Sequence, residues 1–123
     1  MVKLGDIRQI LTTIGDWFYY QKLESELKGM SSVLDLGCGS NSPLSKIKKN
    51  FFSVGVDIFE PSIKKSKKNK IHDEYKIADV LEIDKFFKRK SFDVVVALDL
   101  IEHLKKKDGL RLLKKMEVIG RKK

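Results

Sequence analysis

The sequence predicts an α/β fold with a doubly wound parallel sheet, and three observations predict it. From residue 31 onward, four short runs rich in β-forming residues are separated by helical or polar connections, and each run ends on an aspartate. Three of these runs are continuously apolar, as strands are when both faces of a parallel sheet are covered. The connections are long enough to hold the helices that parallel strands need. The runs span residues 32–35, 53–57, 75–79 and 92–99.

The residues before the first run predict a helical segment. Two apolar stripes recur there at helical spacing, and Gly15 between them is interpreted as the end of one helix, with Asp16 capping a second. The second stripe consists of Trp17, Tyr20, Leu23 and Leu27. We expect these side chains to pack against the protein rather than to bind a ligand. The chain therefore divides into a helical segment over residues 1–30 and an α/β domain over residues 31–123.

Helices are also predicted in the connections of the α/β domain. Pro43 and Pro61 suit the first turns of two of them, because a proline there loses no hydrogen bond. The expected helices lie within residues 43–50, 60–70, 84–89 and about 107–119.

Composition narrows the functional classes. The net charge of +9 could indicate an anionic partner, but the lysines cluster in and beside predicted helices without interleaved aromatics that would stack on bases. Solvated helix faces are therefore the favoured interpretation, and nucleic-acid binding is unsupported. The longest apolar runs fall well short of the roughly 20 residues that a membrane span requires. A single cysteine, Cys38, cannot form an internal disulfide, so we expect a cytoplasmic protein with no membrane partner.

The aspartates that end the four runs indicate a binding edge. They are Asp35, Asp57, Asp79 and Asp99. In a doubly wound sheet, ligands bind beyond the carboxyl ends of the strands. Convergent carboxylates there need a ligand that is cationic or rich in hydroxyl and amino donors. Gly37 and Gly39 allow positive φ and a close approach of that ligand to the backbone, and Asp57 lies twenty residues after Gly37, where such folds bind ribose hydroxyls.

Four segments resemble, in order and spacing, the motifs of the class I S-adenosylmethionine-dependent methyltransferase family. They are residues 33–40, 55–58, 78–80 and 95–104. The resemblance implies a Rossmann-like sheet with strand order 3-2-1-4 and flanking helices, with S-adenosylmethionine as the cofactor. It also implies that the chain is truncated before the last three strands of the family fold. A nicotinamide dinucleotide site would instead need a glycine in place of Ser42 and usually lacks an acid in place of Asp35.

The resemblance further implies roles at the methionine end of the cofactor. Gly37 and Gly39 would line it, and the backbone near Ala97 and Leu98 would receive the ammonium group. Asn41 stands where many family members have a third glycine, and asparagine tolerates positive φ, so the loop is expected to keep its shape.

At the adenosine end, the resemblance implies that Asp57 holds the ribose and Ile58 packs on the adenine. Asp79 and the Val80 amide would read the adenine edge. The implied cofactor-binding residues are Asp35, Gly37, Cys38, Gly39, Asp57, Ile58, Asp79, Val80, Ala97 and Leu98.

Catalytic candidates are few. Asp99 and His103 follow the fourth run, and Asp99 either touches the substrate or caps the turn before Glu102. A metal site on Glu102 and His103 would need a further histidine downstream, whereas the other histidine, His72, precedes the third run, so no metal is expected. Cys38 could be a thiolate nucleophile, although a small residue that fills a tight turn is the favoured interpretation.

The expected reaction is methyl transfer to an unidentified acceptor, with a small molecule favoured. Alignment of the acceptor with the methyl group would supply most of the rate, so no dedicated base is required. Two alternatives stay open: a non-catalytic S-adenosylmethionine-binding module or subunit completed by a partner, and an RNA methyltransferase supported by net charge alone. With the sheet ending at its fourth strand, the apolar edge between Phe92 and Leu98 would be unpaired, which predicts self-association.

Overall fold

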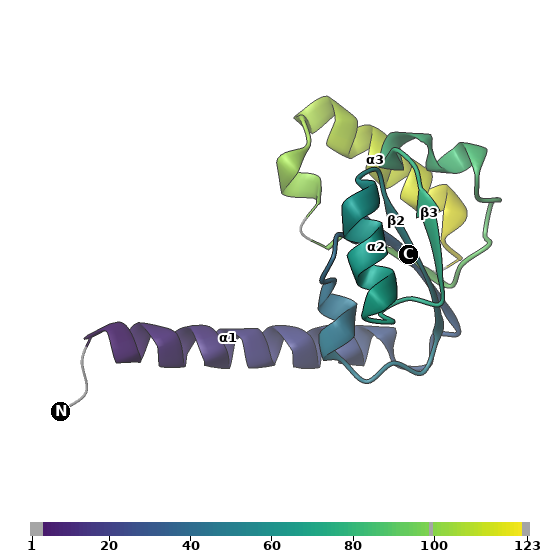
Figure 1. Cartoon of the computed structure of the whole chain (residues 1–123). Helices are drawn as coiled ribbons and strands as arrows, with labels where there is room; N and C mark the ends of the chain where they lie inside the picture. Colours follow the sequence, from purple (N-terminus) through teal and green to yellow (C-terminus); the bar gives the residue numbers. More distant parts are fainter. Residues whose placement is uncertain (1–3, 99, 122–123) are drawn as a thin grey trace.

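The computed structural model describes the backbone of residues 4–98 and 100–121, with side chains from residue 14 onward in these ranges (Figure 1). The helices are α1 (Leu4–Leu27), α2 (Glu60–Lys68) and α3 (Lys106–Ile119). Three short 3₁₀ turns are η1 (Pro43–Lys46), η2 (Val80–Lys85) and η3 (Ile101–His103). The strands are β1 (Ser32–Leu36), β2 (Phe52–Asp57), β3 (Glu74–Ile77) and β4 (Val94–Val96).

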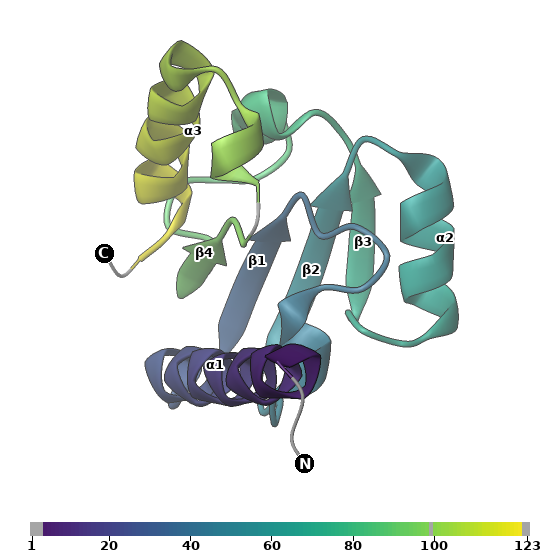
Figure 2. The same ribbon diagram turned by 90° about the vertical axis from the view of Figure 1, so that its left-hand side faces the viewer.

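The four strands form one parallel sheet in the order β3-β2-β1-β4 (Figure 2). Leu34 of β1 lies opposite both Val54 of β2 and Val95 of β4, which makes β1 an inner strand with a neighbour on each side. This arrangement confirms the predicted Rossmann-like fold class and its strand order. The carboxyl ends of all four strands consequently meet at one edge of the sheet, where the site is expected.

Alternation of side chains along β1 divides the core between the two faces of the sheet. Leu34 and Leu36 are fully buried in the larger cluster, together with Leu112 and Ile119 of α3. The smaller cluster, on the other face, consists of Leu23, Leu27, Val33 and Leu44. The views in Figures 1 and 2 place α2 and α3 on opposite sides of the sheet, as in a doubly wound fold.

The first helix differs from the prediction. α1 continues through Gly15 without a break, because one glycine in a helix costs only about 1 kcal/mol relative to alanine and removes no hydrogen bond. Leu23 and Leu27 are buried and anchor the last turns, whereas the earlier part of the helix projects away from the sheet (Figure 1). Trp17 is 56% exposed and Tyr20 is half-buried, so the predicted packing of this stripe is wrong for Trp17.

Two of the predicted connecting helices are short 3₁₀ turns. In η1, the Ser42 hydroxyl caps the turn by accepting from the Leu44 N–H at 3.2 Å, and Ile47 is already extended, because the chain must return to begin β2. The turn η2 starts at Val80, directly after the third strand, rather than at residue 84. The helices α2 and α3 lie where the sequence predicts them.

The strand β4 is shorter than predicted and forms an edge of the sheet. Its three side chains are half-buried, and among the described strands it pairs with β1 alone. The end of α3 closes its beginning: Phe92 forms an isolated parallel bridge with Gly120, and the Phe92 carbonyl accepts from the Arg121 N–H at 2.8 Å. In the part of the chain that the structure describes, no helix is long and apolar enough to cross a membrane.

Candidate cofactor-binding site

A cavity of about 340 Å³ opens at the carboxyl ends of β1, β2 and β3. It is lined by Gly37, Asp57, Ile58, Ala78, Asp79, Val80, Leu81, Leu100 and Leu104. Among these lining residues, all of them described, there are two carboxylates and no lysine or arginine, although the whole chain carries a net charge of +9. Such a lining favours a ligand with hydroxyl or amino donors or a positive charge, and it disfavours phosphate.

The loop after β1 adopts the backbone conformation that its glycines allow. Gly37 and Gly39 have φ angles of +66° and +59°, in the left-handed region. The Cys38 N–H donates to the Val56 carbonyl at 3.0 Å, and the Gly39 N–H donates to Asp57 Oδ2 at 2.9 Å. Two consecutive amides therefore tie the loop to the end of β2.

Asp57 combines a structural role with free acceptor capacity. Its Oδ2 accepts from Gly39, and its Oδ1 accepts from the Phe59 N–H at 2.9 Å. A carboxylate offers about four lone-pair sites, so each oxygen can accept a second hydrogen bond. Because Asp57 is half-buried and lines the cavity, it can bind a pair of hydroxyl groups while it closes the loop.

The other end of the cavity combines a carboxylate with apolar surface. Asp79 is exposed, and its Oδ1 caps η2 by accepting from the Leu81 N–H at 3.0 Å. Val80 beside it is buried, whereas the Ile58 side chain is 68% exposed at the rim. An apolar side chain beside a carboxylate suits a flat ring that carries amino groups.

Asp35 differs from the expectation that all four aspartates point toward the binding edge. It is 1% exposed, and its Oδ2 lies 2.5 Å from Ser42 Oγ and 3.0 Å from His72 Nε2. Because side chains alternate along a strand, Asp35 shares the sheet face of Val33 and lies beneath the glycine loop, outside the cavity lining. Asp35 contacts the glycine loop through the Ser42 hydroxyl.

Cys38 has the surroundings of an inert thiol. Its side chain is 4% exposed. Burial, and then the nearby charges of Asp35 and Asp57, raise the pKa of the thiol to about 12. The thiol is protonated at neutral pH, which argues against a nucleophile and agrees with a small residue in a tight turn. What Cys38 contributes to the loop is its backbone N–H.

Three of the predicted site residues after β4 do not line the cavity. Ala97 and Leu98 are half-buried, pack against the larger and smaller apolar clusters respectively, and do not line the cavity. Asp99 lies outside the described residues. His103 is exposed at the end of η3 and also lies outside the cavity lining. Over residues 4–98 and 100–121, no three His, Cys, Asp or Glu side chains gather as a metal ion would require.

Three leucines of the cavity were not singled out by sequence reasoning: Leu81, Leu100 and Leu104. A Cβ on Gly37 would come within 2.9 Å of Leu100 Cδ1, so Leu100 covers the glycine loop closely. The signal for two of them was present, since Leu100 and Leu104 belong to the fourth motif and are spaced one helical turn apart.

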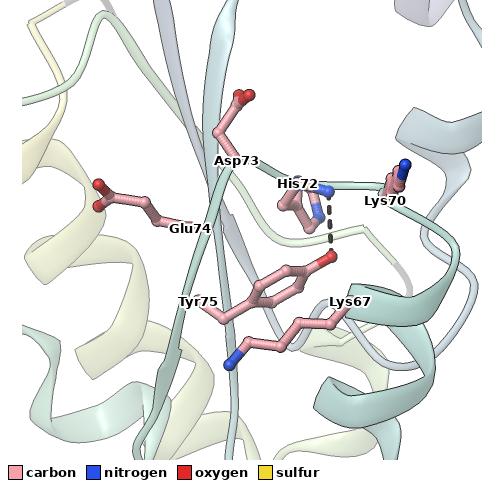
Figure 3. Close-up of a pocket in the computed structure, with 6 residues that line it drawn as sticks. All are labelled: Lys67, Lys70, His72, Asp73, Glu74 and Tyr75. Atoms are coloured by element: carbon pink, nitrogen blue, oxygen red, sulfur yellow. Dashed lines mark hydrogen bonds between the residues drawn. The ribbon is translucent and has the colours of Figure 1, made fainter.

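A second pocket, of about 470 Å³, lies at the start of β3 (Figure 3). It is lined by Lys67, Lys70, His72, Asp73, Glu74 and Tyr75. Both signs of charge surround it, and the Tyr75 hydroxyl accepts from the His72 N–H at 3.0 Å. This pocket has no single chemical preference, so the cavity beside the glycine loop is the better candidate.

Comparisons with known proteins agree with this choice. The methyltransferase-domain family matches residues 34–122. The crystal structure of the PH0226 protein from Pyrococcus horikoshii is 25% identical, with a TM-score of 0.69 over 94% of this chain and 50% of that chain. A SAM-dependent methyltransferase from Archaeoglobus fulgidus is 26% identical, with a TM-score of 0.61 over 82% of this chain and 48% of that chain.

A third structure shows the same fold at lower identity. Magnesium protoporphyrin IX methyltransferase from Synechocystis, solved with bound SAM, is 19% identical, with a TM-score of 0.64 over 98% of this chain and 61% of that chain. The chain thus spans about half the length of the first two structures and less than two thirds of the third. No curated protein sequence matches it.

Proposed function

Because this chain belongs to the methyltransferase-domain family, the class I S-adenosylmethionine-dependent methyltransferases, we propose that it binds S-adenosylmethionine in the cavity beside the glycine loop and methylates a small molecule. The observation that carries the proposal is the lining of that cavity, which has two carboxylates, a left-handed glycine and no basic residue. S-adenosylmethionine has a sulfonium, an ammonium, two ribose hydroxyls and an adenine amino group, and it has no phosphate. The lining therefore fits this cofactor better than a dinucleotide.

At the adenosine end, Asp57 would accept hydrogen bonds from the ribose hydroxyls with the lone pairs that Gly39 and Phe59 leave free. Asp79 and the Val80 amide would bind the adenine edge. The exposed Ile58 side chain would cover the adenine face, which gives this apolar surface a partner. Each hydrogen bond to a charged acceptor contributes roughly 1.5–3 kcal/mol.

At the methionine end, the backbone of Gly37, Cys38 and Gly39 would lie against the cofactor, and the backbone near Ala97 and Leu98 would receive the ammonium group. Asp35 would contribute indirectly, by fixing the loop through Ser42, as its burial supports. Asp99 and His103 are the proposed acceptor-side residues, because both follow β4 in the sequence, shortly after Ala97 and Leu98.

When bound, the cofactor supplies a methyl group on a sulfonium centre that is reactive toward a nucleophile. The residues of this chain would orient that methyl group and exclude water from the apolar side of the cavity. Alignment of two reactants accounts for most of the rate of such a transfer, so a dedicated base among these residues is not needed.

Two further proposals concern the surroundings of the protein. The predicted unpaired edge is closed at Phe92 by Gly120, but beside β4 no described strand covers it, and the β4 side chains are apolar and half-buried, which supports pairing with a second copy of the chain. Light scattering is expected to show mass that rises with concentration, and a constant monomer mass would contradict this. We also propose a cytoplasmic location, because a chain with a single cysteine cannot form an internal disulfide.

Isothermal titration calorimetry with S-adenosylmethionine tests the proposed function. The unmodified chain is expected to bind, and Asp57→Ala is expected to weaken binding at least about tenfold, because the ribose loses a charged acceptor. Glu26→Gln, which removes an exposed carboxylate paired with Lys22 on α1, is the matched control and should bind normally. Equal binding by Asp57→Ala and the unmodified chain, or binding by neither, would overturn the proposal.

A further inference from the structure

We propose that His72 is a positioning residue for the cofactor, which sets the glycine loop through Asp35 and Ser42. The inference rests on the proposed function of the cavity beside that loop. The His72 side chain is fully buried, and His72 is absent from the lining of that cavity, so any effect on the cofactor must pass through other residues.

A continuous row of buried hydrogen bonds makes this connection. Ser53 Oγ lies 2.8 Å from His72 Nδ1, and His72 Nε2 lies 3.0 Å from Asp35 Oδ2. The same carboxylate oxygen lies 2.5 Å from Ser42 Oγ. None of the four residues is more than 6% exposed, so water does not compete for these bonds. We call Ser53, His72, Asp35 and Ser42 the buried polar row.

One arrangement of protons satisfies every member of the row. A neutral imidazole donates from one ring nitrogen and accepts at the other. Donation from His72 Nε2 to Asp35, acceptance at Nδ1 from the Ser53 hydroxyl, and donation by the Ser42 hydroxyl leave no group without a partner. Asp35 then receives two donors on one oxygen. Removing the donor of His72 leaves a buried carboxylate with Ser42 alone, which is unfavourable.

The imidazole is itself held in a fixed position. The Tyr75 hydroxyl accepts from the backbone N–H of His72 at 3.0 Å, as Figure 3 shows, and it lies 2.6 Å from Ser66 Oγ of α2. The Tyr75 and His72 rings meet edge to face, with centroids 5.5 Å apart. A Cβ on Gly55 would come within 2.6 Å of His72 Cδ2, so the glycine at this position leaves the ring the space that it occupies.

At its other end, the row reaches the glycine loop. Cys38 and Gly39 fasten the first half of the loop to β2, and Ser42 fastens the second half to Asp35. The Ser42 hydroxyl also accepts from the Leu44 N–H, so it joins the loop to η1. Without the bond from Ser42 to Asp35, the second half of the loop loses this anchor, and the glycine backbone proposed to lie against the cofactor is less firmly positioned.

Two substitutions of His72 separate positioning from mere packing. His72→Gln keeps a donor at the position of Nε2 and loses the ring, whereas His72→Asn keeps an acceptor at the position of Nδ1 but is too short to reach Asp35. Both lose the ring contacts with Tyr75 and Gly55, and both keep the hydrogen bond from the backbone N–H of residue 72 to the Tyr75 hydroxyl. The amide resonances of Gly37 and Gly39 in the cofactor-free protein report the loop by NMR, and calorimetry with S-adenosylhomocysteine reports its consequence.

We expect His72→Asn to shift both glycine resonances and to weaken S-adenosylhomocysteine about tenfold, while His72→Gln stays within about twofold of the unmodified chain. Equal shifts and equal affinities in the two variants, at equal thermal stability, would overturn the proposal. If the His72 variants do not fold, two substitutions of Ser42 test the other end of the row. Ser42→Ala, which loses the hydroxyl, should shift the glycine resonances and weaken binding, whereas Ser42→Thr, which keeps the hydroxyl, should not. Failure of the unmodified chain to bind would instead overturn the proposed function, and the NMR comparison would still decide on the row.

Discussion

The inner strand β1 and the outer strand β4 differ in how deeply their side chains are buried. In β1, four of five side chains are buried, and the strand has a parallel neighbour on each side. In β4, all three side chains are half-buried, and among the described strands only β1 pairs with it. Each end of the proposed site depends on one inner and one outer strand: the adenosine-end residues follow β2 and β3, and the methionine-end residues follow β1 and β4. The difference teaches that one cofactor site can combine loops that follow a buried inner strand with loops that follow a more exposed edge strand.

The largest expected effect tests this contrast in burial directly. Leu34→Ala in β1 should lower the free energy of unfolding by about 3 kcal/mol, because it leaves a cavity in the larger cluster. Val95→Ala lies opposite in β4, is half-buried, and should cost only about 1 kcal/mol. Urea unfolding of both variants measures the two values. Equal losses would show that the edge strand is packed as firmly as the centre.

A second contrast concerns glycines. Gly55→Ala should lower the free energy of unfolding by about 2 kcal/mol, because the new Cβ would meet His72, Cys38 and Tyr75 at 2.6, 2.9 and 3.2 Å. Gly15→Ala in α1 meets no atom within 4 Å and should raise it by about 0.5 kcal/mol. The same unfolding experiment applies, and a Gly55 variant as stable as the parent would rule out the tight packing around His72.

The last expected effect is absent at neutral pH: it is a pH dependence at the glycine loop, where the Cys38 thiol is buried. Because burial raises the pKa of the Cys38 thiol from its ordinary value of 9.0 to about 12, the unfolded chain loses the thiol proton first as the pH rises. Stability from this group is therefore complete below pH 9 and declines between pH 9 and about 12. Cys38→Ala should lack this share of the decline. Parallel alkaline unfolding curves for the variant and the parent would contradict the assignment.

Sequence patterns predicted the features that depend on strand ends and failed where partners are distant. The parallel sheet, the left-handed glycines and the position of Asp57 follow from local pattern, and the order of the strands follows from the family resemblance. The buried Asp35 carboxylate is paired with His72, which lies 37 residues away, and no local signal identifies that pairing. The unbroken α1 shows another limit, because Gly15 weakens a helix without ending it.

The central claim is that the cavity is made for an adenosyl ligand without phosphate, and competition among nucleotides tests it most directly. In calorimetry at one fixed salt concentration, S-adenosylhomocysteine should bind to the unmodified chain, and ATP and NAD should bind at least about tenfold more weakly, because their phosphates face Asp57 and Asp79 with no cation in the lining. Binding of ATP or NAD as tightly as S-adenosylhomocysteine would contradict the claim.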